Sequence, residues 1–231
     1  MEAIDLEIGY HKTIAKGSFH FMPGNLVGLI GNNGSGKTTL LKTMAGFLKP
    51  IHGSILLNEK SVNEYSSSEL AKKISIVTTG FVDFPILTVE EVVSLGRYPF
   101  TGQFGKLSQR DEEIVKSVMN ECGVYERKNK WIQELSDGER QKVFIAKSLA
   151  QESEVLLLDE PTSFLDVRSK VRLMSLLEKL VSLMRKKIFI STHDIPLIAQ
   201  CANSFVLFSD ADEWMVTEDK EKILEWQMSQ R

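Results

Sequence analysis

Short apolar runs alternate with longer amphipathic stretches along most of this chain. Runs that are apolar throughout are typical of strands buried on both faces of a sheet, and we predict such strands at Leu26–Ile30, Ile74–Val77, Val155–Leu158, Ile188–Ile190 and Phe205–Phe208. Other stretches have helical spacing or helix boundaries, and we predict helices at Thr38–Ala45 (stopped by Gly46), Arg110–Cys122, Gly138–Ala150, Ser169–Met184 and Glu221–Gln227. Strands that alternate with helices predict an α/β fold whose largely parallel sheet is covered on both faces.

One region departs from this alternation. Residues 81–150 contain helical patterns and loops but no convincing strand. We interpret residues 81–150 as a helical subdomain inserted in the core, and residues 1–231 as a single domain. The chain has no internal repeat and no low-complexity segment.

Composition narrows the class of protein. The chain has 231 residues, of which 42% are hydrophobic and 26% charged, with a formal net charge of −3. These values are those of a globular protein, and they argue against one that depends on broad basic attraction to nucleic acid. Cys122 and Cys201 match no zinc pattern, so we expect buried thiols in a reducing compartment. No apolar run is long enough to span a membrane, so a membrane role would need a partner.

The strongest chemical signal is GNNGSGKT, residues 31–38, which matches the phosphate-binding pattern G-x-x-x-x-G-K-[ST] in full. Glycines let the backbone wrap phosphate oxygens, and successive N–H groups with a helix N-terminus attract anions. Lys37 would reach the β- and γ-phosphates, and the Thr38 hydroxyl would bind Mg²⁺. We predict that ATP is held by Gly31, Asn32, Asn33, Gly34, Ser35, Gly36, Lys37, Thr38 and Thr39. The alternative is a glycine turn with an exposed lysine.

A second signal is VLLLDEPT, residues 155–162, an apolar strand that ends in two carboxylates. Parallel strands direct their carboxyl ends toward the ligand crevice. Asp159 would therefore bind Mg²⁺, directly or through water, and Glu160 would polarise the water that attacks the γ-phosphate. Without the phosphate loop upstream, a solvated acidic pair would be the better interpretation.

The sequence LSDGERQ, residues 135–141, identifies a family. Ser136 and Gly138 open a predicted helix, where hydroxyl and amide groups can bind phosphate or simply cap the helix. The order of phosphate loop, LSDGE segment and acidic strand is that of the ABC ATPases, and the chain strongly resembles an ABC transporter nucleotide-binding subunit over essentially its whole length. The resemblance implies a P-loop NTPase (RecA-like) core, an N-terminal antiparallel β region, an inserted helical subdomain and ATP hydrolysis with Mg²⁺.

The resemblance also implies roles for single residues. Tyr10 would stack on adenine, His193 would contact the γ-phosphate, and Asp166 would lie in the loop that bridges two subunits. Glu160, His193 and Lys37 would be catalytic. In this family the LSDGE segment of one subunit closes on ATP held by another, which implies a head-to-tail homodimer. One copy would supply Tyr10, Lys37, Thr38, Asp159, Glu160 and His193, and the other would supply Ser136 and Gly138.

One position departs from the family pattern. Members usually carry a glutamine after the strand that here reads KISIVTT, and counting back from Thr88 places Thr79 there. A threonine hydroxyl can still bind a metal or water, although its reach is shorter. We predict Thr79 as a metal-site residue, with an ordinary loop residue as the alternative.

The segment VEEVVSLGRYPFTG, residues 89–102, is similar to the corresponding stretch in importers of iron-siderophores, haem and cobalamin. The resemblance implies an ATPase at the cytoplasmic face of the membrane that acts with a separate permease and an extracytoplasmic binding protein. A soluble ABC protein acting on ribosomes or DNA is one alternative. A P-loop kinase or GTPase is another, but it would leave LSDGERQ unexplained, and no NKxD motif is present.

Overall fold

The computed structural model describes residues 1–78, 86–102, 105–209 and 211–229. Its larger sheet has the strand order β10-β9-β3-β8-β7-β6, parallel except for β10 at one edge. The strands are β3 (Leu26–Ile30), β6 (Ile74–Val77), β7 (Val155–Asp159), β8 (Lys187–Ser191), β9 (Ser204–Phe208) and β10 (Trp214–Thr217). The predicted α/β fold is confirmed, and all five predicted strands are present within one residue at either end.

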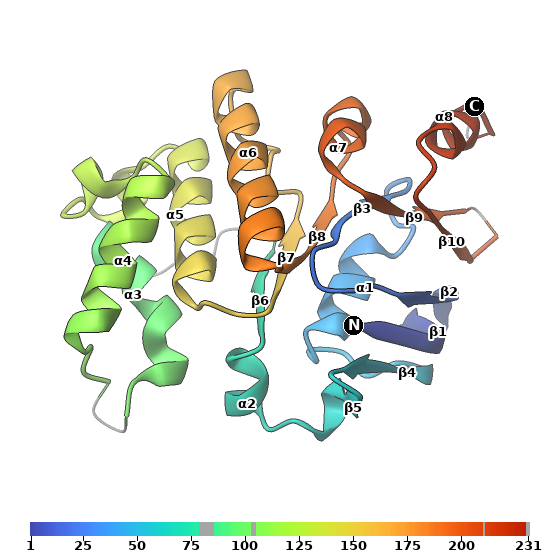
Figure 1. Cartoon of the computed structure of the whole chain (residues 1–231), viewed down its shortest axis with the longest axis horizontal. Coiled ribbons are helices and arrows are strands. Elements are labelled where there is room, and N and C mark those ends of the chain that lie inside the picture. The colour runs from blue at the N-terminus through green and yellow to red at the C-terminus, as the bar shows by residue number, and fades with distance from the viewer. Residues whose placement is uncertain (79–85, 103–104, 210, 230–231) are drawn as a thin grey trace.

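A smaller antiparallel sheet is formed by the N-terminal part of the chain, in the order β2-β1-β4-β5. Its strands are β1 (Glu2–Gly9), β2 (Thr13–His20), β4 (His52–Leu57) and β5 (Lys60–Ser61). Figure 1 shows this sheet at one end of the molecule and the helices α3, α4 and α5 at the other. The expected N-terminal antiparallel region is therefore confirmed.

The helices are α1 (Lys37–Met44), α2 (Ser67–Ala71), α3 (Val89–Ser94), α4 (Gln109–Glu121), α5 (Asp137–Ala150), α6 (Val167–Met184), α7 (Ile195–Cys201) and α8 (Glu221–Ser229). The five predicted helices are present within two residues at either end. Gly46 follows the first of them with a φ of 75°, as its predicted role as a helix stop requires. The helices α2, α3 and α7 were not predicted individually, because they are too short to show a helical repeat of apolar residues.

The buried strands supply both faces of the larger sheet with apolar side chains. Successive side chains of a strand point to opposite faces. Leu156 and Leu158 therefore pack in the cluster formed with α5, α6 and α7, whereas Val155 and Leu157 pack with α1 and the N-terminal sheet. This two-sided burial explains why these strands read as continuous apolar runs rather than as alternating ones. None of the helices in the described ranges has both the length and the apolar content that crossing a membrane requires.

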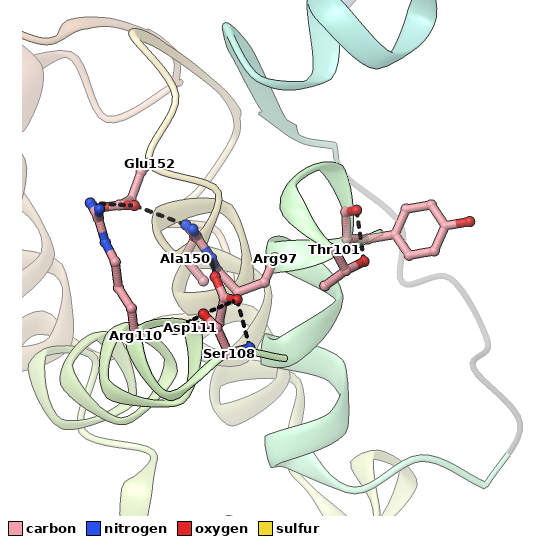
Figure 2. A network of polar contacts seen from close by, with 8 residues as sticks. Arg97, Thr101, Ser108, Arg110, Asp111, Ala150 and Glu152 are labelled. Atoms are coloured by element: carbon pink, nitrogen blue, oxygen red, sulfur yellow. Dashed lines mark hydrogen bonds and ion pairs between the residues drawn. The ribbon is translucent and has the colours of Figure 1, made fainter. Parts of the chain in front are cut away.

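A buried arginine fastens the helices α4 and α5 to each other (Figure 2). Arg97 lies in a 3₁₀ helix at Leu95–Phe100, and its side chain is only 4% exposed. Its Nε donates to Asp111 at 2.8 Å, and its Nη1 donates to the Ala150 carbonyl at 2.7 Å and to Glu152 at 2.9 Å. One side chain thus joins the start of α4 to the end of α5.

The same network holds the first turn of α4. Asp111 accepts hydrogen bonds from the Ser108 amide at 2.9 Å and the Ser108 hydroxyl at 2.6 Å, which closes a capping box. The Ser108 hydroxyl and amide, together with the Arg97 guanidinium, lower the pKa of Asp111 to about 2. The predicted boundary of the helical subdomain at residue 81 lies outside the described residues, so its limits stay a prediction.

Candidate active site

The predicted phosphate loop connects the end of β3 to the start of α1, and its glycines are required by its shape. A Cβ atom at Gly31 would lie 2.4 Å from the Ser35 Oγ and 2.8 Å from the Phe208 Cβ. Gly34 and Gly36 have φ angles of 82° and 105°, which side chains rarely allow. The loop therefore curls tightly in front of the helix N-terminus, as its sequence predicts.

Two polar side chains in this loop are suited to an anionic ligand. The Lys37 Nζ donates to the carbonyls of Gly31 at 2.7 Å and Asn32 at 2.8 Å, so the ammonium lies over the loop. Burial lowers the pKa of Lys37, and the Glu160 and Asp159 carboxylates oppose that change. The Ser35 hydroxyl is buried and has no hydrogen-bond partner among the residues that the structure describes. A phosphate oxygen would satisfy such a donor, because buried polar groups are normally hydrogen-bonded.

The structure brings Asp159 against the start of α1. The Thr38 Oγ1 donates to the Asp159 Oδ2 at 2.8 Å, and the Ser191 Oγ donates to the Oδ1 at 2.5 Å. A hydroxyl and a carboxylate side by side are the oxygen ligands that Mg²⁺ prefers. The pair Thr38 and Asp159 thus fits the metal role expected of it.

Glu160 is held in a strained conformation beside His193. Its φ is 48°, and its amide donates to the Ser191 carbonyl at 3.1 Å and to the Ser191 hydroxyl at 3.0 Å. Strain in a non-glycine residue persists where surrounding bonds impose it, often at a functional site. The Glu160 Oε1 lies 3.0 Å from the His193 Nε2 but without the alignment of a good hydrogen bond. This contact brings the predicted general base and the predicted γ-phosphate contact together.

Ser191 is the residue of this site that sequence reasoning missed. It ends β8, the strand next to β7, and it binds both Asp159 and the Glu160 backbone. A polar residue at the carboxyl end of an apolar strand, directly before Thr192 and His193, was the available signal. The sequence does not show that Ser191 lies beside Asp159 and Glu160, because that depends on the order of the strands in the sheet.

The structure places the Tyr10 turn near the phosphate loop. Tyr10 follows β1 and is 58% exposed. Residues 12–14, which follow it, and the phosphate loop both border a cavity of about 330 Å³. The residues that line this cavity are Lys12, Thr13, Ile14, Asn32, Asn33, Gly34, Ser35, Ser209 and Asp212. The exposed ring of Tyr10, in the same turn, is available for stacking on a base. Thr39 is instead buried in α1.

Three further predicted residues, Ser136, Gly138 and Asp166, lie at the starts of α5 and α6, and two of them cap these helices. Ser136 and Glu139 form a capping box at the start of α5. Asp166 accepts hydrogen bonds from the Ser169 amide at 2.8 Å and hydroxyl at 3.0 Å at the start of α6, an intrachain role that the sequence analysis did not assign. A Cβ at Gly138 would lie 2.6 Å from the Phe164 carbonyl, so this glycine allows α5 to approach the segment before α6.

The described chain does not bring the LSDGE segment to its own phosphate loop. Ser136 pairs with Glu139, and Gly138 faces the Phe164 carbonyl. Figure 1 shows α5 and α1 apart, with α6 and β7 between them in this view. Thr79 lies outside the described residues, so its metal role stays a prediction.

Comparisons with known proteins identify the family of this chain. Residues 14–163 match the family model of the ABC transporter domain. An uncharacterised ABC transporter ATP-binding protein of Methanocaldococcus jannaschii is 39% identical over 208 residues, which cover 89% of this chain and 72% of that protein. The iron(3+)-hydroxamate import ATP-binding protein of Bacillus subtilis is 39% identical over 172 residues, 74% of this chain and 64% of that protein.

Solved structures resemble this chain over nearly its whole length. A dimeric ATP-binding cassette in a post-hydrolysis state with ADP and Pi is 25% identical, with a TM-score of 0.83 and coverage of 94% of this chain and 98% of that one. A transporter described as of the metal-chelate type, in an inward-facing conformation, is 25% identical, with a TM-score of 0.81 and coverage of 96% and 84%.

Proposed function

Because this chain belongs to the ABC transporter family and is an ATP-binding, ATP-hydrolysing subunit of that family, we propose that it powers the import of an iron-siderophore or similar metal chelate through a separate membrane permease. The observation that carries the ATPase part is the convergence of Lys37, Thr38, Asp159, Glu160 and His193 at the carboxyl ends of neighbouring strands. The cargo is supported by the iron(3+)-hydroxamate import protein among the relatives.

Each group at this site has a chemical task in the proposed reaction. Lys37 would leave the loop carbonyls and bind the phosphates, where an ammonium gains more from an anion than from a neutral carbonyl. Thr38 and Asp159 would hold Mg²⁺, which neutralises charge on the phosphates. Glu160 would accept a proton from the attacking water, and His193 would hold the γ-phosphate in place.

We further propose that two copies assemble head to tail, each completing the other's site. The LSDGE segment lies at the start of α5, and the placement of α5 apart from α1 in Figure 1 supports this arrangement. The dimeric cassette among the solved structures supports it independently.

The remaining partners follow from the same proposal. The chain would bind the permease at the cytoplasmic face of the membrane, and the permease would receive the chelate from an extracytoplasmic binding protein. Residues 81–150 would act as the helical subdomain, and Thr79 would complete the metal site. No nucleic acid is part of this function, which fits the net charge of −3.

Reconstitution tests the proposal against its alternative. Vesicles should carry the candidate permease in the membrane, with this chain and ATP inside and the binding protein outside. Such vesicles should accumulate a ferric hydroxamate. Vesicles with Glu160→Gln should not accumulate it. Uptake that does not depend on ATP, or stable co-sedimentation of the chain with ribosomes or DNA instead of the permease, would contradict the proposal.

A further inference from the structure

A second cavity, of about 230 Å³, lies between the phosphate loop and the loop that carries His193. Three separate segments form its walls: the end of β3 with the phosphate loop, the segment after β8, and the last helix, α8. The lining residues are Ile30, Gly31, Asn32, Thr192, His193, Ile195, Trp226 and Gln227. No role for α8 was predicted, yet two of its side chains face the same space as His193.

The helix α8 is anchored in a way that fixes this wall. Ile223 is 1% exposed and packs in the core. The Trp226 Nε1 donates to the Phe208 carbonyl at 2.8 Å, and Phe208 ends β9, the strand paired with β3 just before the phosphate loop. An indole N–H that is partly buried normally requires such an acceptor. The hydrogen bond therefore fixes the indole ring to the strand that adjoins the phosphate loop.

His193 has a fixed neighbour on one side and this cavity on the other. Its Nε2 lies 3.0 Å from Glu160, and its side chain is 52% exposed. The loop around it is held by Asp194, whose amide donates to the Thr192 hydroxyl at 3.0 Å and whose carboxylate pairs with Lys170 at 2.9 Å. These bonds hold the loop backbone, and the half-exposed imidazole borders the cavity. One wall of that cavity is formed by α8.

We propose that α8 is a positioning element of the ATP site, in which Trp226 and Gln227 limit the movement of His193 and keep its imidazole directed toward the γ-phosphate. The inference rests on the proposed hydrolytic role of His193. Trp226 and Gln227 are positioning residues, since they act through His193. Because the indole lines the same cavity as His193 and the phosphate loop, its environment should change when Mg-ATP binds there.

Tryptophan fluorescence tests the placement directly. The chain contains three tryptophans, Trp131, Trp214 and Trp226. A variant that keeps only Trp226, with phenylalanine at the other two positions, should change its emission on Mg-ATP binding. The matched variant that keeps only Trp131, a residue 43% exposed, should not, when both are measured at protein concentrations low enough to keep the chain monomeric. Equilibrium dialysis measures nucleotide binding separately. An unchanged emission can then be distinguished from a failure to bind ATP.

Steady-state kinetics tests the positioning role. Gln227→Ala leaves the core anchor of α8 intact and should lower kcat about tenfold with an ATP KM within about twofold of wild type, because misplacement by about 1 Å can cost a larger factor. Trp226→Phe keeps the ring but removes the donor and should act in the same direction. Leu224→Ala, on the same helix at a side chain 61% exposed, is the control and should keep the wild-type rate.

The outcomes separate this inference from the proposed function. Two results would contradict the role of α8 and leave the ATPase assignment intact. In the first, Gln227→Ala has the same kcat as Leu224→Ala while the wild type hydrolyses ATP. In the second, the emission of the Trp226-only variant does not change although dialysis shows that nucleotide is bound. If the wild type neither binds nor hydrolyses ATP, the proposed function fails and the inference falls with it.

Discussion

Two regions of this molecule bury polar and charged side chains in different ways. In the network around Arg97, the guanidinium pairs with Asp111 and Glu152, and Asp111 also caps α4. At the ATP site, Ser35 has a buried hydroxyl without a partner in the described structure, and Glu160 has a strained backbone. In the first region the charged groups pair with one another within the chain. In the second region a buried hydroxyl can still donate to a ligand.

The physical reason for this difference is the cost of leaving a buried polar group unsatisfied. A satisfied network stabilises one arrangement of the helices it joins. An unsatisfied one destabilises the isolated protein but gains free energy when a ligand supplies the missing partner. We therefore expect changes at the ATP site to affect the reaction first, and changes at Arg97 to affect stability first.

The largest effect is expected at the ATP site. Glu160→Gln should still bind ATP but lower its hydrolysis by about 10²–10⁴-fold, the usual contribution of a positioned base. The free energy of unfolding should change little, because the amide keeps the shape of the carboxylate. Phosphate release in the presence of the permease measures the rate, and Glu112→Gln, at an exposed position of α4, is the control. Turnover near the wild-type rate would reject Glu160 as the base.

The opposite pattern is expected at the buried network. Arg97→Met should lower the free energy of unfolding by about 3–5 kcal/mol, because Asp111 would remain buried without its partner. Arg110→Met removes an arginine that is 80% exposed and 4.0 Å from Glu152, and it should cost less than about 1 kcal/mol. Urea denaturation followed by circular dichroism measures both. Equal midpoints for the two variants would mean that the network does not fasten the helices.

A smaller effect distinguishes two helix caps of the same geometry. Ser136→Ala and Ser108→Ala both remove a capping-box hydroxyl, so each should destabilise its helix by about 1 kcal/mol. In a Glu160→Gln background, only the change at Ser136 should also weaken ATP-dependent dimerisation, by about tenfold, because it removes a hydrogen bond to a charged phosphate. Light scattering over a range of concentrations measures the dimer. An equal loss of dimer with Ser108→Ala would contradict the composite site.

The last effect is the pH dependence of the Arg97 network. The pKa of Asp111 is lowered from 3.8 to about 2 in the folded chain. Its contribution to stability is therefore fully present well above pH 4 and is lost as the pH falls through about 2. Urea midpoints between pH 4 and pH 2 should fall less steeply for Asp111→Asn, which has no charge to lose. Parallel curves for the two proteins would exclude Asp111 as a source of acid lability.

Much of this protein is determined by short stretches of its sequence. Continuous apolar runs identified the five buried strands of the larger sheet, since side chains on both faces must be buried. The order of phosphate loop, LSDGE segment and acidic strand was sufficient to predict the family, because spacing around phosphate tolerates few other residues. Lys37, Thr38, Asp159 and Glu160 were predicted as site residues in this way.

Other features were decided by tertiary structure, because they depend on residues that are distant in the chain. Ser191 joins the site only because β8 lies beside β7, and Arg97 meets Glu152 only because the 3₁₀ helix packs against the end of α5. Trp226 lines the cavity beside His193, and its hydrogen bond to the end of β9 holds it there. Local patterns report on neighbours within a few residues, whereas these contacts depend on the order of strands and the packing of helices.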